Sequence, residues 1–93
     1  MKSLIKRLVV KNDGFCNCKK PANERIDSII NRYAVKMQEK GWIPYCWVSS
    51  GNSFAFYEAY VRLCKPSNDL ERKEMVERAM DQGWTEKDGF LVV

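Results

Sequence analysis

The chain has 93 residues and a net charge of +4, and 45% of its residues are apolar. That length excludes a multidomain protein, and residues 1–93 are expected to form a single domain. The apolar content excludes intrinsic disorder, and no run approaches the roughly 18 apolar residues of a membrane span. Because Met1 to Arg7 lack the apolar segment of a secretory signal, we expect a cytoplasmic protein with no membrane contact.

Positive charge is concentrated at the start of the chain. Residues 1–25 carry a net charge of +5, because seven Lys or Arg residues stand against two acidic residues. A basic segment of this kind can attract an anionic partner. The alternative is a solvated edge strand, since Lys residues at a sheet edge also prevent aggregation. The cations that would meet an anionic partner here are Arg7, Lys11, Lys19 and Lys20.

Cysteine usage gives little support for a metal site. The chain has four cysteines and no histidine, and Cys16 and Cys18 form its one closely spaced pair. Structural zinc sites usually combine two Cys-x-x-Cys pairs, or cysteine with histidine. Free thiols are the expected state in the cytoplasm, so we expect no metal and no cofactor.

The first third of the chain predicts a strand and then a helix. Residues 4–11 are aliphatic and β-branched, which indicates a strand. From about Asn23 to Lys40 the apolar residues recur every three or four positions, which predicts an amphipathic helix that ends at Gly41. Its apolar stripe consists of Ile26, Ile29, Ile30, Tyr33, Ala34 and Met37.

The middle third predicts a β-hairpin from Trp42 to Lys65. Gly51-Asn52 at its centre tolerates the positive φ angles of a tight turn. Strict alternation along the strands assigns side chains to two faces. One face would carry small and aliphatic residues, namely Pro44, Cys46, Val48, Ala55, Tyr57, Ala59, Val61 and Leu63. The other would collect aromatic residues, with Glu58 and Arg62 among them: Tyr45, Trp47, Phe54, Phe56 and Tyr60.

The last third repeats the helix-to-strand pattern. Asn68 and Glu71 predict the capped start of a second helix, which ends at Gly83. Asp88-Gly89 then turns the chain into a short strand at residues 90–93. Gly-Trp follows both helices, and we expect Trp42 and Trp84 to pack in the core.

This order of elements predicts an α+β fold of ferredoxin-like βαββαβ topology. Right-handed crossovers would place two helices on one face of a four-stranded antiparallel sheet and leave the other face open. Five aromatic residues on an open face exceed the apolar area that monomers usually expose. We therefore expect a binding surface formed by Tyr45, Trp47, Phe54, Phe56, Tyr60 and Arg62, with Arg7, Lys11, Lys19 and Lys20 supplying charge.

Four partners could cover this face. A second copy of the chain would bury it in a homo-oligomer. RNA bases could stack on it, because Asn52–Tyr57 partly matches the RNP1 pattern of RNA-recognition domains. A planar anionic ligand such as a nucleotide could be held between the rings, or a protein target could use them as interface anchors. Catalysis has the least support, because the chain has no His and no GxSxG, HExxH or phosphate-loop motif.

Residues 4–65 resemble a family of small bacterial and phage domains of unknown function. The shared pattern is an amphipathic helix, Gly41-Trp42-Ile43-Pro44, and a hairpin whose second strand carries the run Phe56 to Val61. Cys46 and Glu58 depart from it, where the pattern has Gly and Gln. The resemblance implies the fold and a phage-type origin. Proteins of that kind often block host defence factors or sequester small signalling molecules.

We therefore expect a non-catalytic protein that binds a host factor or an anionic nucleotide-type ligand. An RNA-binding module that uses the same open face is the alternative.

Overall fold

The computed structural model describes residues 2–11, 22–51 and 56–93. Within these ranges, neither helix is long and apolar enough to cross a membrane. The order of helices and strands confirms the predicted α+β class. In chain order, the elements are β1 (Lys2–Lys11), α1 (Ala22–Glu39), β2 (Ile43–Gly51), β3 (Phe56–Lys65), α2 (Asp69–Asp81), β4 (Thr85–Lys87) and β5 (Phe90–Val92).

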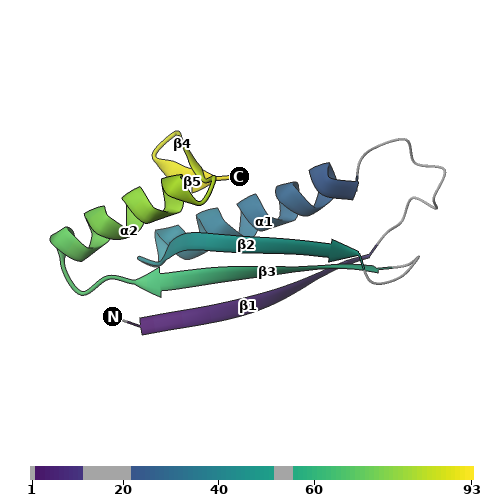
Figure 1. Ribbon diagram of the computed structural model, residues 1–93, viewed down its shortest axis with the longest axis horizontal. Coiled ribbons are helices and arrows are strands. Elements are labelled where there is room, and N and C mark those ends of the chain that lie inside the picture. Colours follow the sequence, from purple (N-terminus) through teal and green to yellow (C-terminus); the bar gives the residue numbers. More distant parts are fainter. Residues whose placement is uncertain (1, 12–21, 52–55) are drawn as a thin grey trace.

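The sheet has three strands, and the predicted four-stranded sheet is wrong. β1, β3 and β2 pair in that order, and both pairings are antiparallel. The last strand, β5, instead pairs with β4, a strand that the sequence analysis missed, in a separate two-stranded sheet. Figure 1 shows both helices on one side of the three-stranded sheet, with β1 at one extreme of the molecule and the β4–β5 hairpin at the other.

A two-residue turn makes the β4–β5 hairpin. Asp88 and Gly89 both have positive φ, at 54° and 85°. Two consecutive residues of this conformation form the tight turn that fits the twist of a hairpin, for which Asp-Gly is a favoured pair. The predicted turn is therefore confirmed, but it joins β5 to β4 and does not return the chain to the three-stranded sheet.

Side-chain amides on α1 bind the free edge of β5. Gln38 Nε2 donates to the Leu91 carbonyl at 2.8 Å, and the Leu91 N–H donates to Gln38 Oε1 at 2.7 Å. Asn31 pairs with both backbone groups of Val93 in the same way, at 3.2 and 2.7 Å. Leu91 and Val93 are two residues apart, so their backbone groups lie on the same edge of the strand. The two amides thus take the place of a neighbouring strand.

Both helices end in the same hydrogen-bonded motif. Gly41 and Gly83 have φ angles of 94° and 104°, which favour glycine. The N–H groups of Trp42 and Trp84 each donate back five residues, to Met37 and Ala79, both at 3.0 Å. This is the Schellman motif, which is usually accompanied by an apolar contact from the residue after the glycine.

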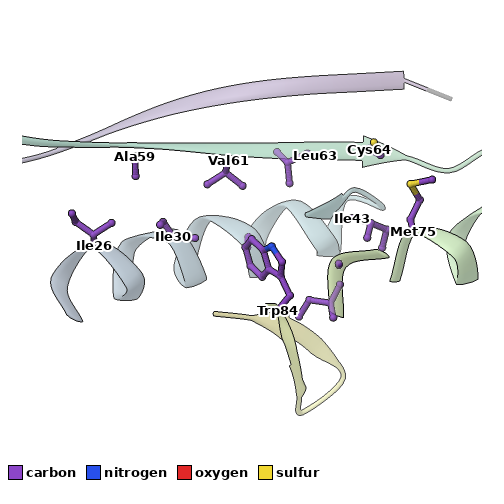
Figure 2. Packing of buried hydrophobic residues seen from close by; sticks show 12 residues of the cluster. Ile26, Ile30, Ile43, Ala59, Val61, Leu63, Cys64, Met75 and Trp84 are labelled. Carbon is purple, nitrogen blue, oxygen red and sulfur yellow. The ribbon is translucent and has the colours of Figure 1, made fainter. Parts of the chain in front are cut away.

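The core lies between the three-stranded sheet and the helices. Figure 2 shows Ala59, Val61 and Leu63 pointing from β3 toward Ile26 and Ile30 of α1. Trp84 is fully buried in the same cluster, and Trp42 packs against its edge with Lys65 Nζ 5.8 Å from the ring centroid. The predictions that Ala59, Val61 and Leu63 face the helices and that both tryptophans pack with the core are confirmed.

Replacing Gln38 by Ala should lower the free energy of unfolding by about 1–3 kcal/mol, because the backbone groups of buried Leu91 lose both partners. The amide hydrogen of Leu91 should also exchange faster. Urea unfolding and hydrogen exchange measure the two effects. The matched control is Gln82→Ala, at an exposed position, which should change stability by less than about 0.5 kcal/mol. Equal losses in the two variants would show that the amide does not hold β5.

Asp27 lies one turn before Asn31 on α1, and its carboxyl makes the stability of the fold depend on pH. Its Oδ1 is buried without a hydrogen-bond partner among the described residues. Burial raises the pKa of this carboxyl above its ordinary 3.8, because desolvation disfavours the charged form. The folded state therefore holds the proton more tightly than the unfolded state. This group's contribution to stability is greatest below pH 3.8 and falls as pH rises through the folded pKa.

Replacing Asp27 by Asn should remove that pH-dependent loss. We expect the variant to gain stability relative to the parent as pH rises from about 3 to 7, with the gain levelling off once the parent's carboxyl is ionised. Urea unfolding of both proteins at a series of pH values measures the difference. A difference that stays constant over the whole series would contradict the raised pKa.

Candidate binding surface

The pairing of β1 with β3 defines two faces of the sheet. Leu4, Lys6 and Leu8 lie opposite Leu63, Val61 and Ala59, on the face that the helices cover, which we call the inner face. Ile5, Arg7 and Val9 lie opposite Arg62, Tyr60 and Glu58, on the other face, which we call the outer face. Directly opposed residues of an antiparallel pair point to the same side, so each β1 residue shares the face of its β3 partner.

A β-bulge changes the faces of β2. Pro44 lies opposite Leu63 on the inner face, as predicted, but the register shifts between Pro44 and Cys46. After the shift, Cys46, Trp47 and Val48 lie opposite Arg62, Val61 and Tyr60. The extra residue in the bulge reverses the faces of Cys46, Trp47 and Val48 relative to strict alternation from Pro44.

The predicted faces of Cys46, Trp47 and Val48 are therefore wrong. Trp47 points to the inner face, and both Tyr45 and Trp47 are partly buried against the core cluster. Cys46 and Val48 point to the outer face instead. Two of the five aromatic residues predicted for the open face, Tyr45 and Trp47, therefore pack against the core instead. The prediction failed because the strict alternation assumed for β2 is interrupted at the bulge.

Next to the row Ser3–Cys64–Ile43, in which Cys64 and Ile43 are buried, three cross-strand rows follow on the outer face. In each row, one residue comes from β1, one from β3 and one from β2. The rows are Ile5–Arg62–Cys46, Arg7–Tyr60–Val48 and Val9–Glu58–Ser50, in which the backbone alone places Ser50.

Apolar side chains on this face are open to solvent. The exposed fractions are 58% for Ile5, 53% for Val9, 55% for Val48 and 37% for Tyr60. Ile5, Cys46, Val48, Tyr60 and Arg62 line an open hollow of about 340 Å³. The outer face is thus aliphatic with one described aromatic ring, whereas the prediction was an aromatic face.

Glu58 is the centre of a polar cluster on the outer face. It is only 8% exposed, and its carboxylate forms an ion pair with Arg7, which lies diagonally across on β1. The Tyr60 hydroxyl donates to Glu58 Oε2 at 3.4 Å. Both carboxylate oxygens therefore have partners, which explains how an acidic side chain is buried at this position.

The remaining predicted site residues fall into two groups. Arg62 and Tyr60 lie on the outer face within the hollow, and Arg7 lies on the same face beside them. Phe54, Lys19, Lys20 and the Cys16–Cys18 pair lie outside the described residues, and the backbone alone places Lys11 and Phe56, opposite each other.

Sequence reasoning missed the aliphatic part of this surface. Ile5 and Val9 are in a strand that was predicted, and alternation along β1 was the signal that could have assigned them to the face of Arg7. The position of Val48 could not be found in this way, because the bulge precedes it.

The chemistry available on the described part of the chain is limited. No group of three or more His, Cys, Asp or Glu residues there could hold a metal ion. Cys46 and Cys64 are free thiols. The surface offers apolar contact area, one phenol and the guanidinium of Arg62, a combination that suits binding.

Comparison with family models, with curated proteins and with solved structures found no significant match to this chain. The resemblance of residues 4–65 to a family of small phage-type domains therefore stays a prediction.

Two neighbouring residues of β2 test the assignment of faces. Replacing Trp47 by Ala should lower the free energy of unfolding by about 2–4 kcal/mol, because its ring packs against the core. Replacing Val48 by Ala should change it by less than about 0.5 kcal/mol, because that side chain is exposed. Chemical denaturation measures both values. A larger loss of stability for Val48→Ala than for Trp47→Ala would contradict the bulge and support strict alternation along β2.

Proposed function

We propose that this chain is a non-catalytic binding module whose outer sheet face contacts a protein partner. The observation that carries the proposal is the exposure of more than half of Ile5, Val9 and Val48 on one face of the sheet. Exposed apolar side chains that share one face with charged residues are typical of protein interaction sites. Tyr60 and Arg62 lie among them, and Tyr and Arg are frequent anchors of protein interfaces.

The composition of the face favours a protein over RNA or a nucleotide. Base recognition on a sheet depends on several rings on which bases can stack. Tyr45 and Trp47 pack toward the core, and Tyr60 is the aromatic residue that the described outer face retains. Ile5, Val9 and Val48 provide apolar area without a flat ring, which suits contact with protein side chains.

The environment of Glu58 favours a structural role for this residue over a catalytic one. A general acid or base needs a carboxylate that a substrate can reach. The Glu58 carboxylate is buried and occupied by Arg7 and Tyr60. We assign this cluster to holding β1 and β3 together on the outer face.

Site-specific photo-crosslinking in cells tests the proposed surface. A photoreactive phenylalanine analogue at position 48 should give a protein-sized adduct that resists nuclease. The same analogue at Lys73, an exposed position on α2, should give none. Adding Ile5→Asp to the position-48 variant should reduce the adduct at least about tenfold, because a charge replaces an apolar contact.

Other outcomes would contradict the proposal in identifiable ways. A nuclease-sensitive adduct would indicate RNA, and an adduct of twice the chain's mass would indicate a homo-oligomer formed through this face. Equal adducts at positions 48 and 73 would show that the outer face has no special role.

A further inference from the structure

One long edge of β1 has no neighbour among the described residues. β1 pairs with β3 along its whole length, from Lys2 opposite Lys65 to Lys11 opposite Phe56. Strand order places it at the margin of the sheet, and within the described ranges its backbone makes no other hydrogen bond. In an edge strand, every second residue directs its N–H and C=O groups away from the sheet, ready to pair with another strand.

The helices leave this edge accessible from both faces. Lys2 to Arg7 are all exposed, including residues that point to the inner face. Leu4 on the inner face is 37% exposed and Ile5 on the outer face is 58% exposed. The fourth strand predicted for this topology would lie here, and β5 lies against α1 instead. An approaching strand would thus find apolar side chains on both sides of the edge.

The charge of β1 indicates the chemistry of its occupant. Lys2 and Lys6 share the inner face, and Arg7 is on the outer face. Among the described residues the one ion pair is Arg7 with Glu58, so Lys2 and Lys6 have no acidic partner there. Opposite charges on directly facing strand positions are stabilising, and like charges are destabilising.

We propose that the free edge of β1 accepts an extended segment of an acidic protein partner as an additional strand, an inference that rests on the protein-binding function proposed above. Main-chain hydrogen bonds to β1 supply the affinity, as in other cases of strand addition. The partner's acidic residues face Lys2 and Lys6 on the inner side. Its apolar residues alternate with them and extend the outer face beside Ile5 and Val9.

A second copy of the chain fits this edge poorly. Antiparallel pairing of β1 with its own copy would place two sets of Lys2, Lys6 and Arg7 on adjacent strands with no acidic residue between them. Repulsion between facing like charges opposes that pairing. An acidic segment replaces this repulsion by attraction, which is why the occupant is assigned to a different protein.

A synthetic peptide provides the probe. A ten-residue peptide of alternating Glu and Val has the required pattern, and the matched control alternates Lys and Val. Each is titrated at low salt into the isotope-labelled full-length protein, and amide exchange is followed along β1. The Glu/Val peptide should slow exchange by about tenfold or more at alternate β1 residues, those not bonded to β3. The Lys/Val peptide should bind at least about tenfold more weakly.

Charge reversal on the protein provides the second arm. The double variant Lys2→Glu, Lys6→Glu changes two exposed residues, so the fold should be retained. The variant should reverse the peptide preference, so that the Lys/Val peptide now protects the alternate amides and the Glu/Val peptide does not. The wild-type comparison of the two peptides remains decisive if the variant fails to fold.

Three results would overturn the inference. Equal binding of both peptides would remove the charge argument. Protection of the alternate β1 amides in the free protein, together with a dimeric mass, would make a second copy the occupant. Peptide-induced shifts at Val48 and Tyr60 without protection along β1 would indicate docking on the face, and a partner crosslinked at position 48 would then leave the proposed function intact.

Discussion

The amide side chains of Gln38 and Asn31 determine where the end of the chain lies. Each pairs with both backbone groups of one residue, Leu91 or Val93. β5 therefore has β4 on one edge and a helix on the other, and its hydrogen-bonding capacity is met without the three-stranded sheet. Because β5 is held there, β3 is the one described neighbour of β1. The exposed edge and the exposed outer face both follow from this arrangement.

The two faces of the sheet have different roles because the helices cover only one of them. On the inner face, Ala59, Val61 and Leu63 pack under α1 and are completely buried. On the outer face, solvent reaches Ile5, Val9 and Val48, and the buried carboxylate of Glu58 is paired with Arg7. Most of the described apolar core thus lies on one side of the sheet, and the exposed apolar residues of the other side are the ones to which we assign the proposed binding role.

Local signals in the sequence predicted most of the elements. The apolar stripe of α1, the glycines at both helix ends and the Asp88-Gly89 turn depend on neighbouring residues, and each was predicted correctly. The capping box predicted at the start of α2 is confirmed in one half, because Asn68 Oδ1 accepts from the Glu71 N–H at 2.8 Å. In the other half, the Glu71 carboxylate accepts from the N–H of Ser67 at 3.1 Å, not from that of Asn68.

The errors concern pairings between distant segments. Gln38 and Asn31 are polar residues on a helix, and nothing near them in sequence indicates that they bind backbone groups 53 and 62 residues later. The bulge after Pro44 likewise depends on how β2 meets β3. Pro44 is a local signal for an edge strand or a bulge, but it does not distinguish between the two. The face of Trp47, and with it the chemical character of the binding surface, followed from that single pairing.

The bulge at Tyr45 also has an evolutionary consequence. From Cys46 onward, β2 keeps one continuous register with β3, and the residues up to Pro44 are placed by the end of α1. Tyr45 is the surplus residue between these two fixed parts. Loss of its single codon would remove one ring that packs against the core and would leave a regular ladder. A residue could therefore be gained or lost at position 45 while the proposed binding surface keeps its residues and their faces.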